Sequence, residues 1–141
     1  MNVLRDTHRA LVPGGLLLDF HPIAPPWPWV LARGGELGEL RYEPFLDDLR
    51  ATEGGLRDMV SRGLFECVAA RSHDIAVHFD DTQELLDQWL DEEEEWASPE
   101  FKQRLRSTAG PVDVVDRLVF NLYRASDKRA GRTPGSPRRR S

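Results

Sequence analysis

The chain has 141 residues, which fits one ordinary domain at most, and a net charge of −5 at pH 7. Residues 126–141 hold six basic side chains and one acid, so residues 1–125 carry 13 basic and 23 acidic side chains, a net charge of −10. A body this acidic repels the phosphates of nucleic acid, and no apolar run reaches the roughly 18–20 residues that span a bilayer. We therefore expect a domain over residues 1–125 that binds neither nucleic acid nor membrane, followed by a basic disordered tail over residues 126–141.

The cysteine content gives an indication of the cellular compartment of the protein. Cys67 is the only cysteine, so the chain cannot form an internal disulfide. The first residues also lack the layout of a secretion signal. A cytoplasmic location is therefore expected.

The first elements expected along the chain are a helix and a strand. Apolar residues on one helical face predict a helix over residues 3–11, and Pro13-Gly14-Gly15 ends it. Leu16–His21 follows with the composition of a strand. Its first three residues do not alternate with polar ones, which is typical of strands covered on both faces, as in parallel sheets. We therefore expect parallel neighbours for this strand.

A stiff loop and a short strand are expected next. Residues 22–33 contain four prolines around Trp27 and Trp29, a composition typical of an extended loop. A short strand is expected over residues 39–43. The apolar spacing then predicts a helix over residues 45–62, although Gly54-Gly55 costs it about 2 kcal/mol relative to two alanines and predicts a kink or a split.

The remaining pattern alternates strands and helices. Strands are expected over residues 64–70 and 73–79. Two short helices are expected next, the first with an N-cap within Asp80-Asp81-Thr82 and the second capped by Ser98. A last strand is expected over residues 112–123. The order of elements is that of an α/β domain.

One segment is similar to a known family. Residues 9–15 (RALVPGG) and the strand after them resemble class I S-adenosylmethionine-dependent methyltransferases, in which a helix ending in R-x-L-x-P-G-G leads into the fifth strand. The later order is also similar, with a helix, a strand opening at Gly63-Leu64-Phe65-Glu66, and a closing strand over Leu118–Arg124. The family's closing strand is antiparallel and lies between its two predecessors. The resemblance implies the C-terminal half of a Rossmann-like methyltransferase sheet, with its last three strands and flanking helices.

The resemblance also bears on the cofactor. The family's glycine-rich loop, ribose-binding acid and adenine-side residues have no counterpart, and the sequence contains no G-x-G-x-x-G motif. S-adenosylmethionine is thus implied for a complete enzyme, while no cofactor-binding residue is assigned here and the chain alone is not expected to bind it. The expected function is a methyltransferase fragment that acts on a small molecule and is inactive without its N-terminal half.

Candidate site residues come from the end of the first strand and the loop after it. Asp19 and His21 lie two residues apart, on one side of the strand, at the end where open α/β sheets bind ligands. His21 is the candidate general base, and Asp19, Trp27 and Trp29 are candidate substrate-binding residues. The alternative is structural: Asp19 and His21 hydrogen-bond the loop around Pro22, and the tryptophans pack that loop onto the sheet.

A second, non-enzymatic function fits the same pattern. If Leu16–Phe20 lacks its parallel neighbours, the sheet presents an unpaired edge beside an apolar surface, and such edges recruit other chains. The chain would then be an interaction module that buries this edge against a partner or a second copy. Self-association, or association with a missing N-terminal half, is expected in either case.

Overall fold

The computed structural model describes residues 3–90 and 95–127, so the expected tail falls almost entirely on residues 128–141, outside this range. Its elements are α1 (Val3–Ala10), β1 (Leu16–Pro22), β2 (Trp29–Ala32), β3 (Gly35–Glu39), α2 (Phe45–Ser61), β4 (Phe65–Phe79), α3 (Thr82–Gln88), α4 (Pro99–Arg106) and β5 (Val112–Ala125). The protein is an α/β domain with a five-stranded open sheet and four helices in the described range. None of these helices is long and apolar enough to cross a membrane.

The sheet is organised around β5, the last strand. β4 runs antiparallel to β5 along almost its whole length. On its other side, β5 pairs antiparallel with β2 through Val112–Val115 and with β1 through Leu118–Arg124. β3 pairs with β2 as a hairpin. Because β1 and β4 both run antiparallel to the strand between them, they are parallel to each other.

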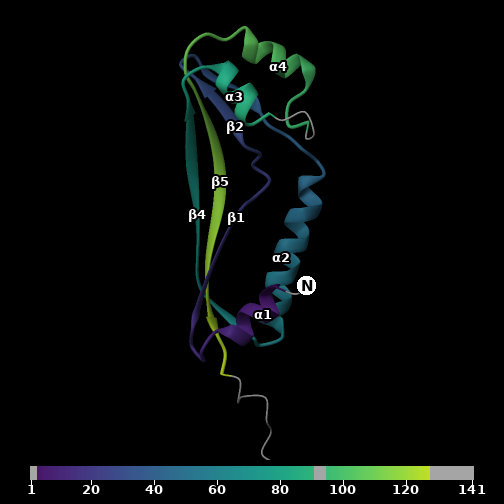
Figure 1. Ribbon diagram of the computed structural model, residues 1–141, viewed down its shortest axis with the longest axis vertical. Helices are drawn as coiled ribbons and strands as arrows, with labels where there is room; N and C mark the ends of the chain where they lie inside the picture. Colours follow the sequence, from purple (N-terminus) through teal and green to yellow (C-terminus); the bar gives the residue numbers. More distant parts are fainter. Residues whose placement is uncertain (1–2, 91–94, 128–141) are drawn as a thin grey trace, which may run out of the picture.

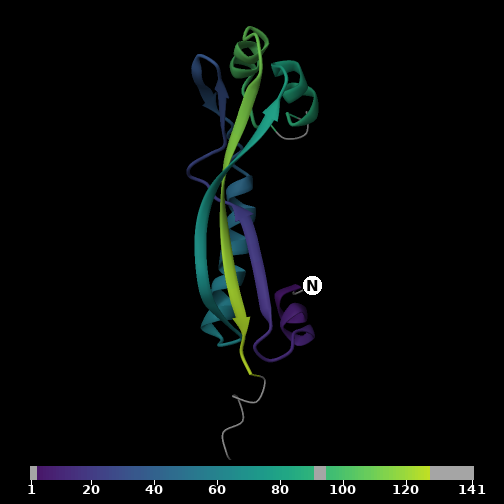
Figure 2. The same ribbon diagram turned by 90° about the vertical axis from the view of Figure 1, so that its left-hand side faces the viewer.

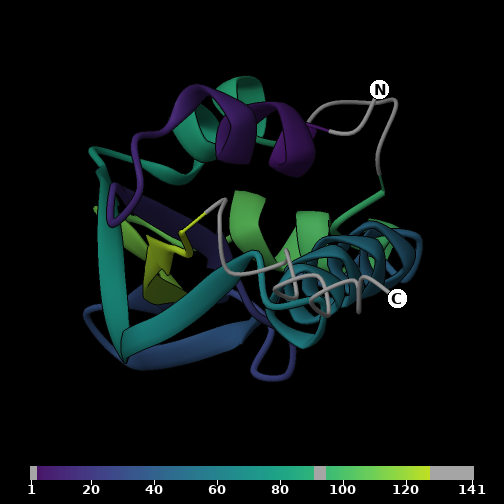
Figure 3. The ribbon, with the colours of Figure 1, turned by 90° about the horizontal axis from the view of Figure 1, so that it is seen from below.

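The helices lie beside the long strands and at both of their ends (Figure 1). α2 forms part of the connection from β1 to β4 and runs beside the sheet, while α3 and α4 lie at the opposite end from α1 (Figure 1). Viewed along the long axis, α1 and α2 lie on two neighbouring sides of the molecule (Figure 3). The expected antiparallel closing strand is confirmed as β5, which lies between β4 on one side and β1 and β2 on the other.

Three expected elements differ from the structure. The two strands expected over 64–70 and 73–79 are one strand, β4, with a register shift between Cys67 and Ala69, because β5 is long enough to pair with all of it. The strand expected over 39–43 is wrong: the chain instead forms the β2–β3 hairpin before that point. α2 runs through Gly54 and Gly55 without a split, because it packs there against α1.

Two apolar clusters hold the described domain together. The first joins the β2 and β5 strands to α3 and α4, and it contains Val30, Leu40, Phe79, Leu85, Leu90, Ala97, Phe101, Leu105, Val112 and Val114. The second joins α2 to the other end of β5, and it contains Leu56, Met59, Phe65, Tyr123 and Ala125. Glycine allows α4 to approach β3, since a Cβ at Gly38 would lie 2.8 Å from Cε2 of Phe101. The expected caps are confirmed: Asp81, one of the three candidates at 80–82, accepts a hydrogen bond from the backbone N–H of Glu84, and Ser98 accepts one from that of Phe101.

β1 is covered on one face only. Leu17 packs against the second cluster, whereas Leu16, Leu18 and Phe20 are 56%, 59% and 63% exposed. The expectation of cover on both faces is wrong, because α2 packs behind the strands and the described chain leaves the front of β1 open (Figure 2). The expectation of parallel partners is also wrong within the described residues, where β1 pairs with β5 alone and antiparallel.

We expect the first cluster to carry much of the stability. Leu105 is fully buried in it, so Leu105→Ala is expected to lower the free energy of unfolding by about 2–5 kcal/mol, through lost burial and the cavity left behind. Val12, which is 71% exposed, provides the control. Val12→Ala is expected to change the free energy of unfolding by less than about 0.5 kcal/mol. Urea unfolding of both variants measures this, and equal effects would contradict the assigned core.

Candidate functional site

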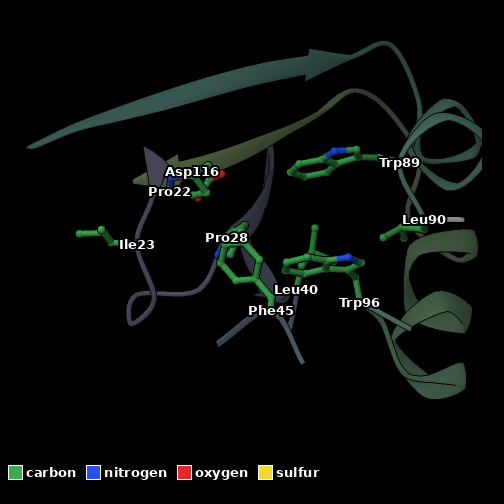
Figure 4. Close-up of a pocket in the computed structure, with 9 residues that line it drawn as sticks. All are labelled: Pro22, Ile23, Pro28, Leu40, Phe45, Trp89, Leu90, Trp96 and Asp116. Atoms are coloured by element: carbon green, nitrogen blue, oxygen red, sulfur yellow. The ribbon is translucent and has the colours of Figure 1, made fainter. Parts of the chain in front are cut away.

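A pocket of about 290 Å³ lies just beyond the carboxyl end of β1. Its walls come from the segment after β1, the start of α2, the segment after α3, and β5; they are Pro22, Ile23, Pro28, Leu40, Phe45, Trp89, Leu90, Trp96 and Asp116 (Figure 4). β4 runs parallel to β1 but continues past this point to Phe79, because Pro22 of β1 and His73 of β4 both lie opposite Leu118 of β5. Open α/β sheets bind their ligands beyond the carboxyl ends of their strands.

Three aromatic rings form much of the pocket wall. The indoles of Trp89 and Trp96 lie on opposite sides of the pocket, with Phe45 beside Trp96 (Figure 4). The Trp96 ring is held by its neighbours, with centroids 5.5 Å from Phe45 and 5.3 Å from Tyr42. Trp89 stacks on Phe79 at 6.5 Å. The packing of these rings gives the pocket fixed, apolar walls with π faces.

Asp116 is the acid of the pocket. Among the lining residues that the structure describes, it carries the one ionisable side chain. Its Oδ1 is buried and has no hydrogen-bond partner in the described part of the chain. Burial raises the pKa of Asp116 above its ordinary value, and the backbone N–H of Arg117 offsets part of this effect. A partly buried acid with a perturbed pKa in an apolar pocket is typical of a functional site.

Asp19 and His21 lie together on the α2 side of the sheet. Nδ1 of His21 is 2.9 Å from Oδ2 of Asp19, which also accepts a hydrogen bond of 3.2 Å from the Asn121 amide. The carboxylate therefore favours the neutral His21 tautomer that carries its proton on Nδ1 and a lone pair on Nε2. Nε2 is buried without a hydrogen-bond partner among the described residues, 3.9 Å from Oε1 of Glu53.

His21 lines a different depression from the aromatic pocket, and Asp19 lines neither of them. His21 faces the groove between α2 and the sheet, which also contains Leu56, Cys67 and Tyr123. Ile23 lines both the groove and the aromatic pocket. With Nδ1 bonded to Asp19, Nε2 is the ring nitrogen left for a general base, but His21 does not line the aromatic pocket.

The two predicted tryptophans do not line the pocket either. Trp27 is 5% exposed, and its ring packs against Phe45 at 6.5 Å and against Trp96 at 6.2 Å. It therefore supports the pocket wall from behind. Trp29 lies in β2, where it pairs with Val115 of β5 and Glu39 of β3.

Sequence patterns alone did not identify Trp89, Trp96 or Asp116 as site residues. The spacing of Trp89 from Leu85 and Leu86 is typical of the apolar face of a helix, and Trp96 follows five consecutive acidic residues. Asp116 carried a usable signal, because alternation along the expected last strand places it on the same face as Val114 and Leu118, which are apolar. Such an acid in a strand requires a partner or a function.

Comparison with protein-family models, with curated proteins and with solved structures finds no match to this chain. Within residues 3–90 and 95–127, no group of three or more His, Cys, Asp or Glu side chains is placed to hold a metal ion. The arrangement itself is that of a small-molecule site, with apolar walls and one polar group that fixes orientation.

The acid of the pocket is expected to make stability depend on pH. Because folding raises the Asp116 pKa above its ordinary value of 3.8, the stabilisation from the neutral acid is fully present below that value and is lost as pH rises through the raised pKa. Asp116→Asn stays neutral at every pH. Its stability relative to the wild type, measured as the free energy of unfolding of the variant minus that of the wild type, is therefore expected to be higher at about pH 7 than at about pH 3.

Denaturant unfolding at both pH values measures this difference. Asp47→Asn, at a side chain that is 83% exposed, is the control for the loss of one charge. A difference between wild type and Asp116→Asn that does not change with pH would contradict the effect of burial on this carboxyl.

Proposed function

We propose that the chain forms the acceptor-binding part of an S-adenosylmethionine-dependent methyltransferase that acts on a small molecule. The observation that supports this most directly is the place of the aromatic pocket in the sheet. β5 lies antiparallel between the parallel strands β1 and β4, as the resemblance to class I methyltransferases implies for their last three strands. The pocket opens at the carboxyl end of β1, where a Rossmann-like sheet binds its ligands.

We place the S-adenosylmethionine site outside the described residues. A cofactor loop follows a strand and opens a helix. Gly14 and Gly63, with φ of 77° and 71°, instead lie in turns that precede β1 and β4. The proposal therefore assigns the cofactor to strands that would pair with the free edge of β1, whichever polypeptide they belong to. On this proposal the chain alone is inactive, does not bind the cofactor, and acts in the cytoplasm.

The pocket suits an acceptor site because its walls are fixed by packing. Transfer of a methyl group depends chiefly on how the acceptor is positioned. Trp96 is held between other aromatic rings, and Asp116 is held in the central strand. These residues would bury the acceptor's apolar surface and orient its polar group. His21 stays a predicted base, with Asp19 as the residue that orients its ring.

An isotope-labelling experiment in the cells that encode the chain tests the proposal without isolating its other half. Cells grown with methyl-labelled methionine pass the label to every product of S-adenosylmethionine. Deletion of the gene is expected to remove at least one labelled small molecule, measured by mass spectrometry. Trp89→Ala is expected to lower the same product, because Trp89 forms a pocket wall.

The control is Val77→Ala, at a residue that is 48% exposed and does not line the pocket, compared with 40% for Trp89. This variant is expected to keep the labelled product at the wild-type level. An unchanged set of labelled small molecules after deletion would overturn the proposal.

The open face of β1 supports the second candidate function, an interaction module. Leu16, Leu18 and Phe20 form an exposed apolar row, and Phe20 stacks on Phe120 of β5 at 5.8 Å. The outer edge of β1 has no strand partner among the described residues. A row of this kind beside unpaired N–H and C=O groups favours association with another chain. As an interaction module, the chain would bury this edge against a second copy or another partner.

Self-association is expected on either proposal when the chain is purified alone. Sedimentation velocity over a range of concentrations is expected to show dimers or larger species. Leu18→Lys places a charge on the open face and is expected to shift the chain toward monomer, whereas Val12→Lys, at an exposed residue before β1, is not. A folded wild-type monomer at every concentration would contradict the expectation.

A further inference from the structure

We propose that the aromatic pocket binds a small molecule through an organic ammonium group, with the rings of Trp89, Trp96 and Phe45 around the cation and the Asp116 carboxylate as its counter-ion. The identification of this ligand as the methyl acceptor rests on the proposed function. The binding site itself rests on the pocket alone. Figure 4 shows the four side chains entering the pocket from different segments of the chain.

The aromatic walls are suited to a cation. The face of an aromatic ring carries negative charge density, so a cation within about 6 Å of the ring is attracted to it, and tryptophan is the strongest partner. Here two indoles lie on opposite sides of the pocket, and a phenyl ring lies beside one of them. Recognition of methylated ammonium groups by cages of aromatic rings uses the same arrangement.

The carboxyl group selects for positive charge. Asp116 has a buried Oδ1 with no hydrogen-bond partner in residues 3–90 and 95–127, and its neighbours in the pocket wall are apolar or aromatic. An ionised acid in such surroundings is unfavourable until a cation joins it. A bound ammonium group would supply that charge and the missing contact. A bound anion would be repelled.

Among the described residues, no positively charged side chain is paired with the Asp116 carboxyl. Across the ladder from Asp116 is Ile75 of β4, which is apolar. The side chain of Arg117, next to it in β5, is bound to Asp74 by hydrogen bonds of 2.7 Å and 3.2 Å. The backbone N–H of Arg117 is the group that offsets the effect of burial on the Asp116 pKa. The carboxyl is thus available to a ligand.

Size and overall charge agree with a small cation. At about 290 Å³ the pocket is close to the lower limit, about 300 Å³, of typical small-molecule sites. In the sequence, Leu90 and Trp96 are joined by five consecutive acidic residues, and residues 1–125 have a net charge of −10. A negative field of this kind attracts cations and disfavours anions such as phosphate esters.

Choline and 3,3-dimethylbutan-1-ol provide a direct test on the purified chain. The two molecules have nearly the same shape, but only choline carries a charge, and that charge does not titrate. Binding is followed by tryptophan fluorescence and by the indole N–H signals of isotope-labelled protein. Choline is expected to shift the Trp89 and Trp96 signals in a saturable manner and to bind at least about tenfold more tightly than the neutral molecule.

Asp116→Asn tests the counter-ion and keeps the shape of the side chain. It is expected to weaken choline binding about tenfold and to leave the neutral molecule unaffected. Wild-type affinity for choline is expected to rise with pH as Asp116 ionises, and this dependence is expected to disappear in Asp116→Asn. Asp47→Asn, at an exposed aspartate outside the pocket, is expected to bind choline as the wild type does.

The outcomes separate this inference from the proposed function. Equal binding of the two probes by the wild type would overturn the ammonium site, while the labelling experiment would still decide whether the gene supports a methyltransferase. Failure of choline to shift the Trp89 and Trp96 signals would also overturn it. Selective choline binding together with an unchanged set of labelled small molecules would support the ammonium site and overturn the methyltransferase proposal.

Discussion

The pairing of β5 with its neighbours is the interaction on which the described structure depends. A strand can form ladders along both of its edges, and β5 does so with β4 on one side and with β2 and β1 on the other. One end of β5 supplies Val112 and Val114 to the first cluster, and the other end supplies Tyr123 and Ala125 to the second. Asp116 lies between these two ends. The strand that joins the two cores therefore also places the acid of the pocket.

Local patterns in the sequence were enough to locate most elements. The caps at Asp81 and Ser98, the helix over Phe45–Ser61 and the closing strand all follow from residues within one turn or one strand of the feature they specify. The pairing partners were harder to predict, because β1 meets β5 about a hundred residues later in the chain. The apolar run at Leu16–Leu18 indicates a strand, but its exposure depends on what packs across it, and the described helices pack on one face only.

The difference between local patterns and long-range contacts also explains which site residues could be predicted. Asp19 and His21 were expected together because residues two apart share one side of a strand, and they are hydrogen-bonded in the structure. The pocket walls could not be found this way, because Trp89, Trp96 and Asp116 meet only when the segment after α3 folds against β5. Trp27 drew attention through its proline-rich surroundings, but its ring lies behind the wall. Composition identified aromatic side chains, while the tertiary fold determined which of them line the pocket.

At Asp116 the stability of the fold favours an apolar residue, whereas the proposed function requires an acid. A half-buried acid among apolar residues destabilises the folded protein whenever it is ionised, and an apolar residue of similar size would fit the strand better. The neighbouring positions Val114 and Val115 are buried and apolar, so the strand itself does not require a charge here. The presence of an acid that lowers the stability of the free protein is explained if a bound ligand supplies a positive charge for its carboxylate. An ammonium group between the indoles would do this, because the rings and the carboxylate then act on the same charge.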